Sequence, residues 1–380
     1  MRKILVVVLV LLLVAAAYLL LMPGLMAPVA WQAPADAGYV GPFTVNTRLA
    51  ELHRITIGTE AGPEHVALGP DGQLYAAVDG GKILRLAPDG ASVEIWARTG
   101  GRVLGFDFDR AGRLIAADSV RGLLAIGPLE GKESGRAISV LADSVAIDGV
   151  QDPIRYADAV AVASDGKIYF TDASRRFSPA QWGGTFTASI LDIMEHARTG
   201  RVLVHDPAAG RTEVAAAGLS FANGIALSAD EQWLFVAETG AYRIWRIPVA
   251  ARNMDLTRSA GEAKVIVDNL PGYPDNLMRG RNGRIWAGLV KPRSRLLDWL
   301  ADKPLLRRVA MRLPQRLWPV PKAYGHVFAF DESGRIVADL QDPSGAYPQT
   351  TGVTETAERL YIQSLHAPVL GWRANDLNLN

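Results

Sequence analysis

The sequence contains no cysteine among its 380 residues. A chain without cysteine cannot build a disulfide framework, a cysteine-ligated zinc site or a thiol nucleophile. It also lacks an excess of charge of either sign, since 40 Lys and Arg stand against 39 Asp and Glu. This balance gives no argument for nucleic acid as a partner. Glycine-rich phosphate loops and G-x-S-x-G turns are missing too, so nucleotide-dependent and serine-hydrolase chemistry have no support.

One long apolar run stands near the N-terminus. Residues 4–22 are 19 consecutive apolar residues, about enough for a helix to cross a bilayer core of ~30 Å. We expect residues 1–22 to be a single-pass signal-anchor. Arg2 and Lys3 would hold the N-terminus in the cytoplasm, which places the remaining chain on the extracytoplasmic side, in a periplasm or lumen. The alternative is a signal peptide cleaved near Ala33-Pro34-Ala35. Residues 23–41, rich in Pro, Ala and Gly, are expected to form a tether.

A short pattern returns six times beyond residue 60: an alternating apolar stretch, a tight turn and a second β-rich stretch. The turns lie at Asp71-Gly72, Ala111-Gly112, Asp165-Gly166, Asp230-Glu231, Asn282-Gly283 and Ala357-Glu358. Asp-Gly and Asn-Gly favour hairpins because both central positions of a type I′ turn need φ > 0. Successive turns are 40, 54, 65, 52 and 75 residues apart, and the shortest spacing matches one four-stranded blade. We predict an all-β fold, a six-bladed β-propeller over residues 42–376, with a β-sandwich as the alternative.

Two segments interrupt the pattern and predict short helical insertions. Residues 189–198 read as a short helix, and residues 291–322 as a longer helical insertion. The longer one contains nine Lys or Arg against Asp298 and Asp302, with leucines, Trp299 and Trp318 between them. A basic amphipathic stretch of this kind can lie in a membrane interface. The alternative is a lid packed on one face of the propeller, and one segment could do both.

Polar residues recur at one position of the repeat, eight residues before the second residue of each turn. In chain order this position holds Glu64, Leu104, Asp158, Asn223, Asp275 and Thr350. The innermost strand of each blade starts near the central channel, so side chains at this position should converge. Three carboxylates and one amide suit Ca²⁺, which takes about 6–8 oxygen ligands, and do not suit zinc. The alternative is four separate strand-end caps. Their common register favours a metal site, because buried carboxylates without a cation are costly.

Several stretches carry a family resemblance when they are taken in order. They are GPEHVA from Gly62, YADAVAVASDGKIYFTDAS from Tyr156, GLSFANGIALS from Gly218, VAETGAYRIWRI from Val236, LPGYPDNL from Leu270 and VLGWR from Val369. The chain resembles the calcium-dependent six-bladed propellers of the gluconolactonase–paraoxonase superfamily, over about residues 40–373. Within that superfamily it is most similar to the strictosidine-synthase-like proteins and to their adipocyte plasma-membrane-associated branch.

This resemblance implies roles for individual residues. The family's calcium ligands fall on Glu64, Asn223 and Asp275, and the fourth position, usually Asn, is Asp158 here. That substitution keeps an oxygen donor and adds a charge. Asn276 is expected to support the ligands from behind or to act as an additional ligand. Plant strictosidine synthases use a glutamate of the last blade as their acid and base. The matching position here is Gly352, which argues against strictosidine synthesis.

These residues predict a calcium-dependent hydrolase of esters or lactones, similar to arylesterases and lactonases. Calcium would polarise the carbonyl, and Asp275, by resemblance, would activate water or attack directly. Another divalent cation would satisfy the same donors. Of the six histidines, only His366 is a candidate for the site. The alternative from another class is a non-catalytic propeller that binds a protein, lipid or glycan at the membrane surface, with calcium purely structural.

Overall fold

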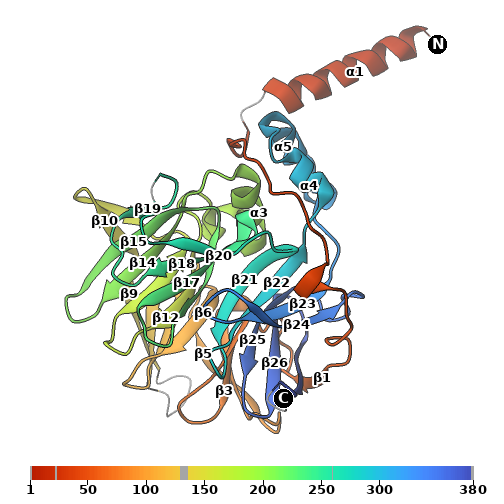
Figure 1. Ribbon diagram of the computed structural model, residues 1–380. Helices are drawn as coiled ribbons and strands as arrows, with labels where there is room; N and C mark the ends of the chain where they lie inside the picture. Colours follow the sequence, from red (N-terminus) through yellow and green to blue (C-terminus); the bar gives the residue numbers. More distant parts are fainter. Residues whose placement is uncertain (1, 22–23, 129–135, 259, 378–380) are drawn as a thin grey trace.

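The computed structural model describes residues 2–21, 24–128, 136–258 and 260–377. Six sheets stand as blades around one axis (Figure 1). From the axis outward, blade 1 contains β2 (His65–Leu68), β3 (Leu74–Val78), β4 (Lys82–Leu86) and β5 (Val93–Arg98). Blade 2 contains β6 (Val103–Phe108), β7 (Leu114–Asp118), β8 (Gly122–Gly127) and β9 (Ala137–Ala142). Blade 3 contains β12 (Ala157–Val162), β13 (Ile168–Asp172), β14 (Gly200–Asp206) and β15 (Arg211–Leu219), with the short β19 (Met254–Asp255) parallel to β15.

The second half of the ring follows the same plan. Blade 4 contains β16 (Ala222–Leu227), β17 (Trp233–Glu238), β18 (Arg243–Pro248) and β20 (Lys264–Val267). Blade 5 contains β21 (Gly272–Arg279), β22 (Ile285–Pro292), β23 (Gly325–Phe330) and β24 (Ile336–Asp342). Blade 6 contains β25 (Thr350–Glu355), β26 (Arg359–Ser364), β27 (Val369–Ala374) and β1 (His53–Thr56). A separate hairpin, β10 (Ser144–Ile147) and β11 (Val150–Pro153), precedes blade 3.

The ring is closed by pairing its two ends. Strand β1, which precedes blade 1 in the sequence, pairs antiparallel with β27 as the outer strand of blade 6. His53 lies opposite Trp372 in this ladder, and their rings stack with centroids 4.4 Å apart. Because closure leaves few free strand edges, it supports both stability and solubility. The six-bladed propeller is confirmed and the β-sandwich alternative is wrong.

The predicted turns connect the inner two strands of their blades, but their geometry differs from the type I′ prediction. In blade 1 the Gly72 N–H donates to the Gly69 carbonyl (3.0 Å), and the Gly69 N–H donates to the Gln73 carbonyl (2.8 Å). Only Gly72 of the Asp71-Gly72 pair has positive φ, +74°. This loop needs positive φ at one residue only, a conformation that glycine adopts most readily and that Glu231 also adopts in blade 4, with φ of +54°.

The core lies between neighbouring blades. Between blades 1 and 2, the fully buried Tyr75 meets Phe108 edge to face with ring centroids 5.2 Å apart. Between blades 4 and 5, Phe235 and Phe330 meet in the same way at 6.0 Å. Each such side chain contributes about 1.5–3 kcal/mol through burial alone. The blades are therefore fixed relative to one another, and so are the inner strands that carry the predicted site.

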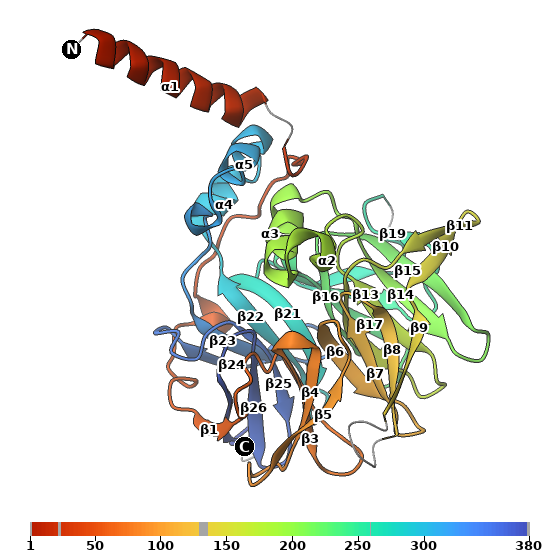
Figure 2. The ribbon, with the colours of Figure 1, turned by 180° about the vertical axis from the view of Figure 1, so that it is seen from behind.

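Both predicted insertions contain helix, with different boundaries. The first insertion begins earlier than predicted and contains two helices, α2 (Pro179–Trp182) and α3 (Thr185–Glu195). The two helices are separate because Gly183 and Gly184 between them both adopt positive φ. The second is divided into α4 (Arg295–Leu300), α5 (Pro304–Ala310) and the 3-10 turn η5 (Gln315–Leu317). Pro304 starts α5 at the position where a helix tolerates proline. Figure 2 shows α3, α4 and α5 at the same end of the propeller.

The predicted tether is residues 23–41, of which residue 23 lies outside the described residues, and residues 26–31 lie against this helical end. The backbone N–H of Val29 donates to the Glu195 carbonyl (2.8 Å), and the N–H of Trp31 donates to the Ala301 carbonyl (3.1 Å). Trp31 stacks on His196 at a centroid distance of 4.0 Å. Met26 is 2% exposed. The segment thus joins α3 to the α4–α5 insertion.

Helix α1 (Arg2–Leu21) precedes this segment and extends away from the propeller (Figures 1 and 2). A membrane span needs about 20 consecutive apolar residues. Within the described part of the chain, no helix combines the length and the apolar character that crossing a bilayer requires. The prediction that residues 4–22 form a transmembrane helix is therefore not supported.

Candidate active site

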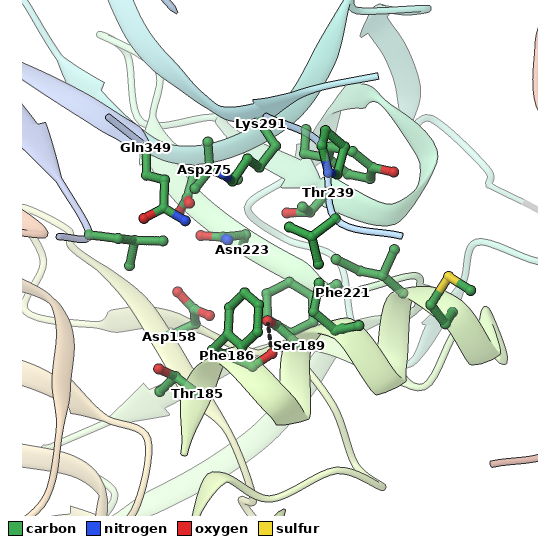
Figure 3. Close-up of a pocket in the computed structure, with 18 of the residues that line it drawn as sticks. Asp158, Thr185, Phe186, Ser189, Phe221, Asn223, Thr239, Asp275, Lys291 and Gln349 are labelled. Carbon is green, nitrogen blue, oxygen red and sulfur yellow. Dashed lines mark hydrogen bonds between the residues drawn. The ribbon is translucent and has the colours of Figure 1, made fainter. Parts of the chain in front are cut away.

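A cavity of about 120 Å³ lies where the inner strands meet the helical insertions. Its floor comes from the starts of the inner strands, and its walls come from α3 and from the 291–322 insertion (Figure 3). Apolar side chains make up most of these walls, including Phe186, Ile190, Phe221, Leu297, Met311 and Val320. Polar groups are concentrated at the axial end, where Asp158, Asn223, Asp275 and Gln349 lie around the same space (Figure 3).

Five of the six positions indexed from the turns line this cavity. Four of them are the predicted ligands Glu64, Asp158, Asn223 and Asp275, all between 3% and 5% exposed. Leu104 of blade 2 is the fifth. The sixth, Thr350, does not line it, because its hydroxyl donates instead to the His326 carbonyl (2.8 Å). Gln349, one residue earlier and with φ of +51°, lines the cavity at that point. All four predicted ligand residues thus line the same cavity.

A repeated irregularity of the inner strands accompanies these positions. In blades 2 to 6 the ladder between the two innermost strands shifts register near the strand start, for example between Ala157 and Val160 in β12 and between Ala222 and Ile225 in β16. Such bulges re-aim side chains. They place Asp158 and Asn223 inside the shifted stretches, so that both side chains reach the axial end. Simple strand alternation in the sequence gave no sign of this feature.

The three carboxylates are electrostatically coupled and deprived of water. Burial raises the pKa of Glu64 to about 7, although the Arg102 guanidinium acts in the opposite direction. Burial, reinforced by the charges of Asp275 and Glu64, raises the pKa of Asp158 well above its usual range. Burial and then Glu64 have the same effect on the pKa of Asp275, which a hydrogen bond from Asn223 opposes. A positive charge among them would restore their ionised forms.

Asn223 provides a sharper test of whether these residues suit a cation. Its side-chain oxygen Oδ1 is buried and has no hydrogen-bond partner among the described residues. A buried carbonyl oxygen without a hydrogen bond is costly unless a cation or a ligand approaches it. In the same part of the chain, however, no three His, Asp or Glu side chains are drawn together closely enough to form a metal centre. The donor chemistry therefore fits a hard cation, while the carboxylates are not gathered around one point.

Arg102 explains part of this arrangement, although no sequence pattern indicates it. Its guanidinium forms an ion pair with the Glu64 carboxylate and reaches Asp79 at 3.2 Å. The side chains of Arg102 and Glu64 are 13% and 7% exposed. The protein thus supplies one positive charge of its own to the carboxylate group. The spacing of the repeat does not indicate Arg102, because Arg102 lies two residues before the position that is counted back from the turn of blade 2. That position is occupied by the apolar Leu104.

Asn276 supports Glu64 from behind. Its Nδ2 donates to the Glu64 backbone carbonyl (2.8 Å), and the Thr351 hydroxyl donates to the same oxygen (2.6 Å). These bonds tie blades 5 and 6 to blade 1 across the axis. His366 lines the cavity mouth and is exposed. Lys291 also lines the cavity, and burial lowers the pKa of its amine; the sequence pattern included it only among the basic residues of the insertion.

Gly352 lies deep in blade 6 beside this site. A Cβ at this position would lie 2.7 Å from the Gln363 side-chain oxygen and 3.3 Å from the Asn276 Cβ. Gln363 is itself held by a 3.1 Å hydrogen bond to the Val66 carbonyl. A larger side chain at position 352 would therefore displace the groups that position Glu64.

Comparison with known proteins places this geometry in a family. A family model described as "Strictosidine synthase-like, N-terminal" matches residues 41–86, and one described as "Strictosidine synthase" matches residues 158–252. The adipocyte plasma membrane-associated protein of Salmo salar is 30% identical over 87% of this chain and 79% of its own length. Protein strictosidine synthase-like 10 of Arabidopsis thaliana is 30% identical over 82% of this chain and 84% of its own. A gluconolactonase structure from Xanthomonas campestris superposes with a TM-score of 0.59 at 19% identity, covering 94% of this chain and 100% of that one.

Proposed function

This chain belongs to the strictosidine-synthase-like family of six-bladed propellers, in the adipocyte plasma membrane-associated branch, and we propose that it hydrolyses lactone or ester bonds at the axial cavity. One observation carries this proposal: three buried carboxylates, and an Asn223 oxygen that accepts no hydrogen bond from the described residues, stand at the polar end of an otherwise apolar cavity. Perturbed titratable groups in a cleft are typical of catalytic sites. The fold shared with a gluconolactonase supports the same reaction class.

The chain's own residues would divide the work as follows. Asp275 would take a proton from the attacking water, or would attack the substrate carbonyl itself. The Asn223 amide, which donates to Asp275, would hold that carboxylate in position. The apolar walls formed by Phe186, Phe221 and Leu297 would exclude bulk water and receive the apolar part of the substrate.

We propose that Glu64, Asp158, Asn223 and Asp275 hold a calcium ion or another divalent cation. The Asn223 Oδ1 atom and the hard-oxygen donor set support this assignment. When bound, the ion would supply Lewis-acid polarisation of the carbonyl. Glu64 would have to turn from Arg102 toward the ion, while Asn276 and Thr351 keep its backbone in place. Asp158, in place of the usual amide, would add one negative charge.

The test is turnover of an aryl-ester and lactone panel by the full chain and by Asp275→Asn. We expect measurable hydrolysis by the unaltered protein and a loss of at least about 100-fold in kcat for the variant, in the range seen when a catalytic group is removed. Asp331→Asn, in an exposed turn, is the matched control and should keep full activity. Turnover that survives in Asp275→Asn would contradict the assignment of Asp275. Absence of turnover on every substrate would favour the non-catalytic binding propeller.

We further propose that α1 attaches the protein to a membrane, with its basic N-terminal end at the lipid headgroups. Arg2 and Lys3 before the apolar run support this orientation. The matching relatives are described as plasma membrane-associated. Co-sedimentation with phospholipid vesicles, for the full chain and for a chain beginning at residue 24, tests this attachment, and equal pelleting of both proteins would contradict it.

A further inference from the structure

The 291–322 insertion carries a group of exposed apolar side chains that its own helices do not cover. Leu296 and Trp299 share one face of α4, three residues apart, and are 52% and 54% exposed. Their neighbours Leu297 and Leu300 point inward, toward the cavity wall and the core. We define the interfacial surface as these two exposed residues together with Leu305, Leu306, Leu313 and Leu317 and the exposed cations Arg295, Arg316 and Lys322.

The charge of this surface is one-sided. Both acidic residues of the insertion are already engaged: Asp298 pairs with Arg293 (3.0 Å), and Asp302 pairs with Lys303 (2.5 Å). The exposed cations therefore face outward among leucines without an acidic counterpart in the insertion. Apolar side chains rimmed by Arg and Lys are typical of helices that lie in the headgroup region of anionic bilayers. A protein partner covering this surface would need complementary acidic groups, which a lipid headgroup layer already supplies.

Helix α1 continues the same surface. The Arg312 guanidinium donates to the Tyr18 carbonyl (3.3 Å), which links the end of α1 to the segment after α5. Figures 1 and 2 both show α1 beside α5 at the helical end of the propeller. Residues 4–10 of α1 are consecutive Ile, Leu and Val side chains, each at least 48% exposed. Exposed apolar area on this scale is poorly tolerated in water. We therefore expect a single partner to cover both α1 and the insertion.

The interfacial surface is also the outer side of the cavity wall. Leu297, Met311, Pro319, Val320 and Pro321 line the cavity, while Leu296, Leu313 and Leu317 beside them in the sequence are exposed. A molecule dissolved in the lipid layer would therefore meet an apolar path from the bilayer to the catalytic carboxylates. A substrate taken from water would not require this arrangement.

We propose that the interfacial surface rests on an anionic phospholipid bilayer and that the cavity receives amphipathic, lipid-dissolved esters or lactones from it. The docking stands on the exposed residues alone, and the substrate class rests on the proposed hydrolase function.

The absence of cysteine makes the docking directly measurable. A single cysteine at Leu306→Cys, labelled with an environment-sensitive fluorophore in the full chain, reports on the surface without background. Val140→Cys, on the outer strand β9 and 46% exposed, is the matched control. In phosphatidylcholine vesicles containing phosphatidylglycerol, we expect a blue-shifted emission and quenching by lipid-attached quenchers at position 306 and neither at position 140.

Charge reversal separates lipid docking from the effect of α1. Arg295→Glu combined with Arg316→Glu should abolish the blue shift at position 306, whereas Arg110→Glu with Arg258→Glu, an equal change of charge elsewhere on the surface, should preserve it. A label at 306 that stays in water with phosphatidylglycerol would overturn the docking. So would a label already buried without vesicles in a protein that runs as a dimer, because a second copy would then cover the surface.

The substrate class has its own measurement. The Arg295→Glu/Arg316→Glu variant should hydrolyse a long-chain lactone dissolved in these vesicles at least about 30-fold more slowly, since each of the two lost cations contributes about 1 kcal/mol of attraction and about 1.4 kcal/mol corresponds to a factor of ten. Its rate with a short-chain, water-soluble lactone should be unchanged. If the variant and the unaltered protein hydrolyse the long-chain lactone at equal rates, the proposal that the substrate comes from the lipid layer is overturned, even if the docking is observed. If the unaltered protein hydrolyses neither lactone, the proposed hydrolase function is contradicted. The docking is then tested by the fluorescence measurement at position 306 alone.

Discussion

The Arg102 guanidinium is paired with the buried Glu64 carboxylate at the axial end of the propeller. This contact links the second blade to the residue just before the first inner strand, across 38 positions of sequence. It gives the group of carboxylates a positive charge from within the protein, and the stability of the site should depend on that charge.

Arg102→Met should lower the free energy of unfolding by about 3 kcal/mol, because it leaves a buried carboxylate without its partner. Chemical denaturation in the presence of a chelator measures this loss. The double variant Arg102→Met/Glu64→Gln should recover part of it, since the unpaired charge is removed. A single variant within about 0.5 kcal/mol of the original protein would mean that the pair carries little of the site's stability.

Asp158→Asn should have opposite consequences with and without calcium. Asp275 and Glu64 both disfavour a charge on Asp158, so the amide should raise the melting temperature in chelator, by a few degrees for about 1 kcal/mol. In excess calcium the gain should disappear, because the extra carboxylate would then be neutralised. Differential scanning fluorimetry under both conditions measures the contrast. An equal shift in both would show that Asp158 does not sense a bound cation.

His196 should make stability sensitive to acid. Burial, followed by the charges of Arg307, Arg198 and Arg243, lowers its pKa from 6.5 to about 3. Because the folded pKa is depressed below the unfolded one, the stability is complete above about pH 6.5 and is lost as the pH falls toward 3. One such group accounts for about 2 kcal/mol between pH 6.5 and 5.

The variant His196→Asn tests this origin. His196 ends α3 with φ of +54°, a conformation that asparagine tolerates. The variant should flatten the pH dependence of unfolding between pH 6.5 and 5 relative to the original protein. Burial lowers the pKa of His65 to about 4. Because His65 is present in both proteins, its contribution to the pH dependence is the same in each and cancels in the comparison. Parallel stability curves would contradict the assignment to His196.

Residues 24–35 should be part of the folded domain. Met26 packs in one cluster with Leu104, Phe221 and Met311, so Met26→Ala should cost about 2–5 kcal/mol. A chain beginning at residue 36 should melt at a lower temperature than the full chain, because it also loses the Trp31–His196 stack. Thermal unfolding of both proteins checks this. An unchanged melting temperature after truncation would restore the view of this segment as a free tether.

The sequence predicted the blade architecture and the four cavity residues because both follow from local chemistry. Turns such as Asp71-Gly72 mark where the inner hairpins bend, and the distance from the turn to the strand start is nearly constant. Counting back from each turn therefore found Glu64, Asp158, Asn223 and Asp275. It failed at Thr350, where the chain lines the cavity with Gln349 instead.

What the sequence could not predict depends on long-range contacts. The pairing of Arg102 with Glu64 has no periodic signal. The Pro- and Ala-rich residues 24–40 read as a tether because composition does not reveal that Val29 and Trp31 hydrogen-bond to α3 and to the chain after α4. The division of the second insertion at Pro304 was visible in principle, since proline often starts a helix, but its leucine content suggested one longer element.

The most direct test of the central claim is hydrolysis of the lactone and ester panel by the full chain, first with calcium, then with excess chelator, then with calcium restored. We expect turnover that disappears with chelator and returns with calcium. Hydrolysis that is unchanged by a chelator, in a protein whose Asp275→Asn variant is equally active, would contradict the assignment of this reaction to the axial carboxylates.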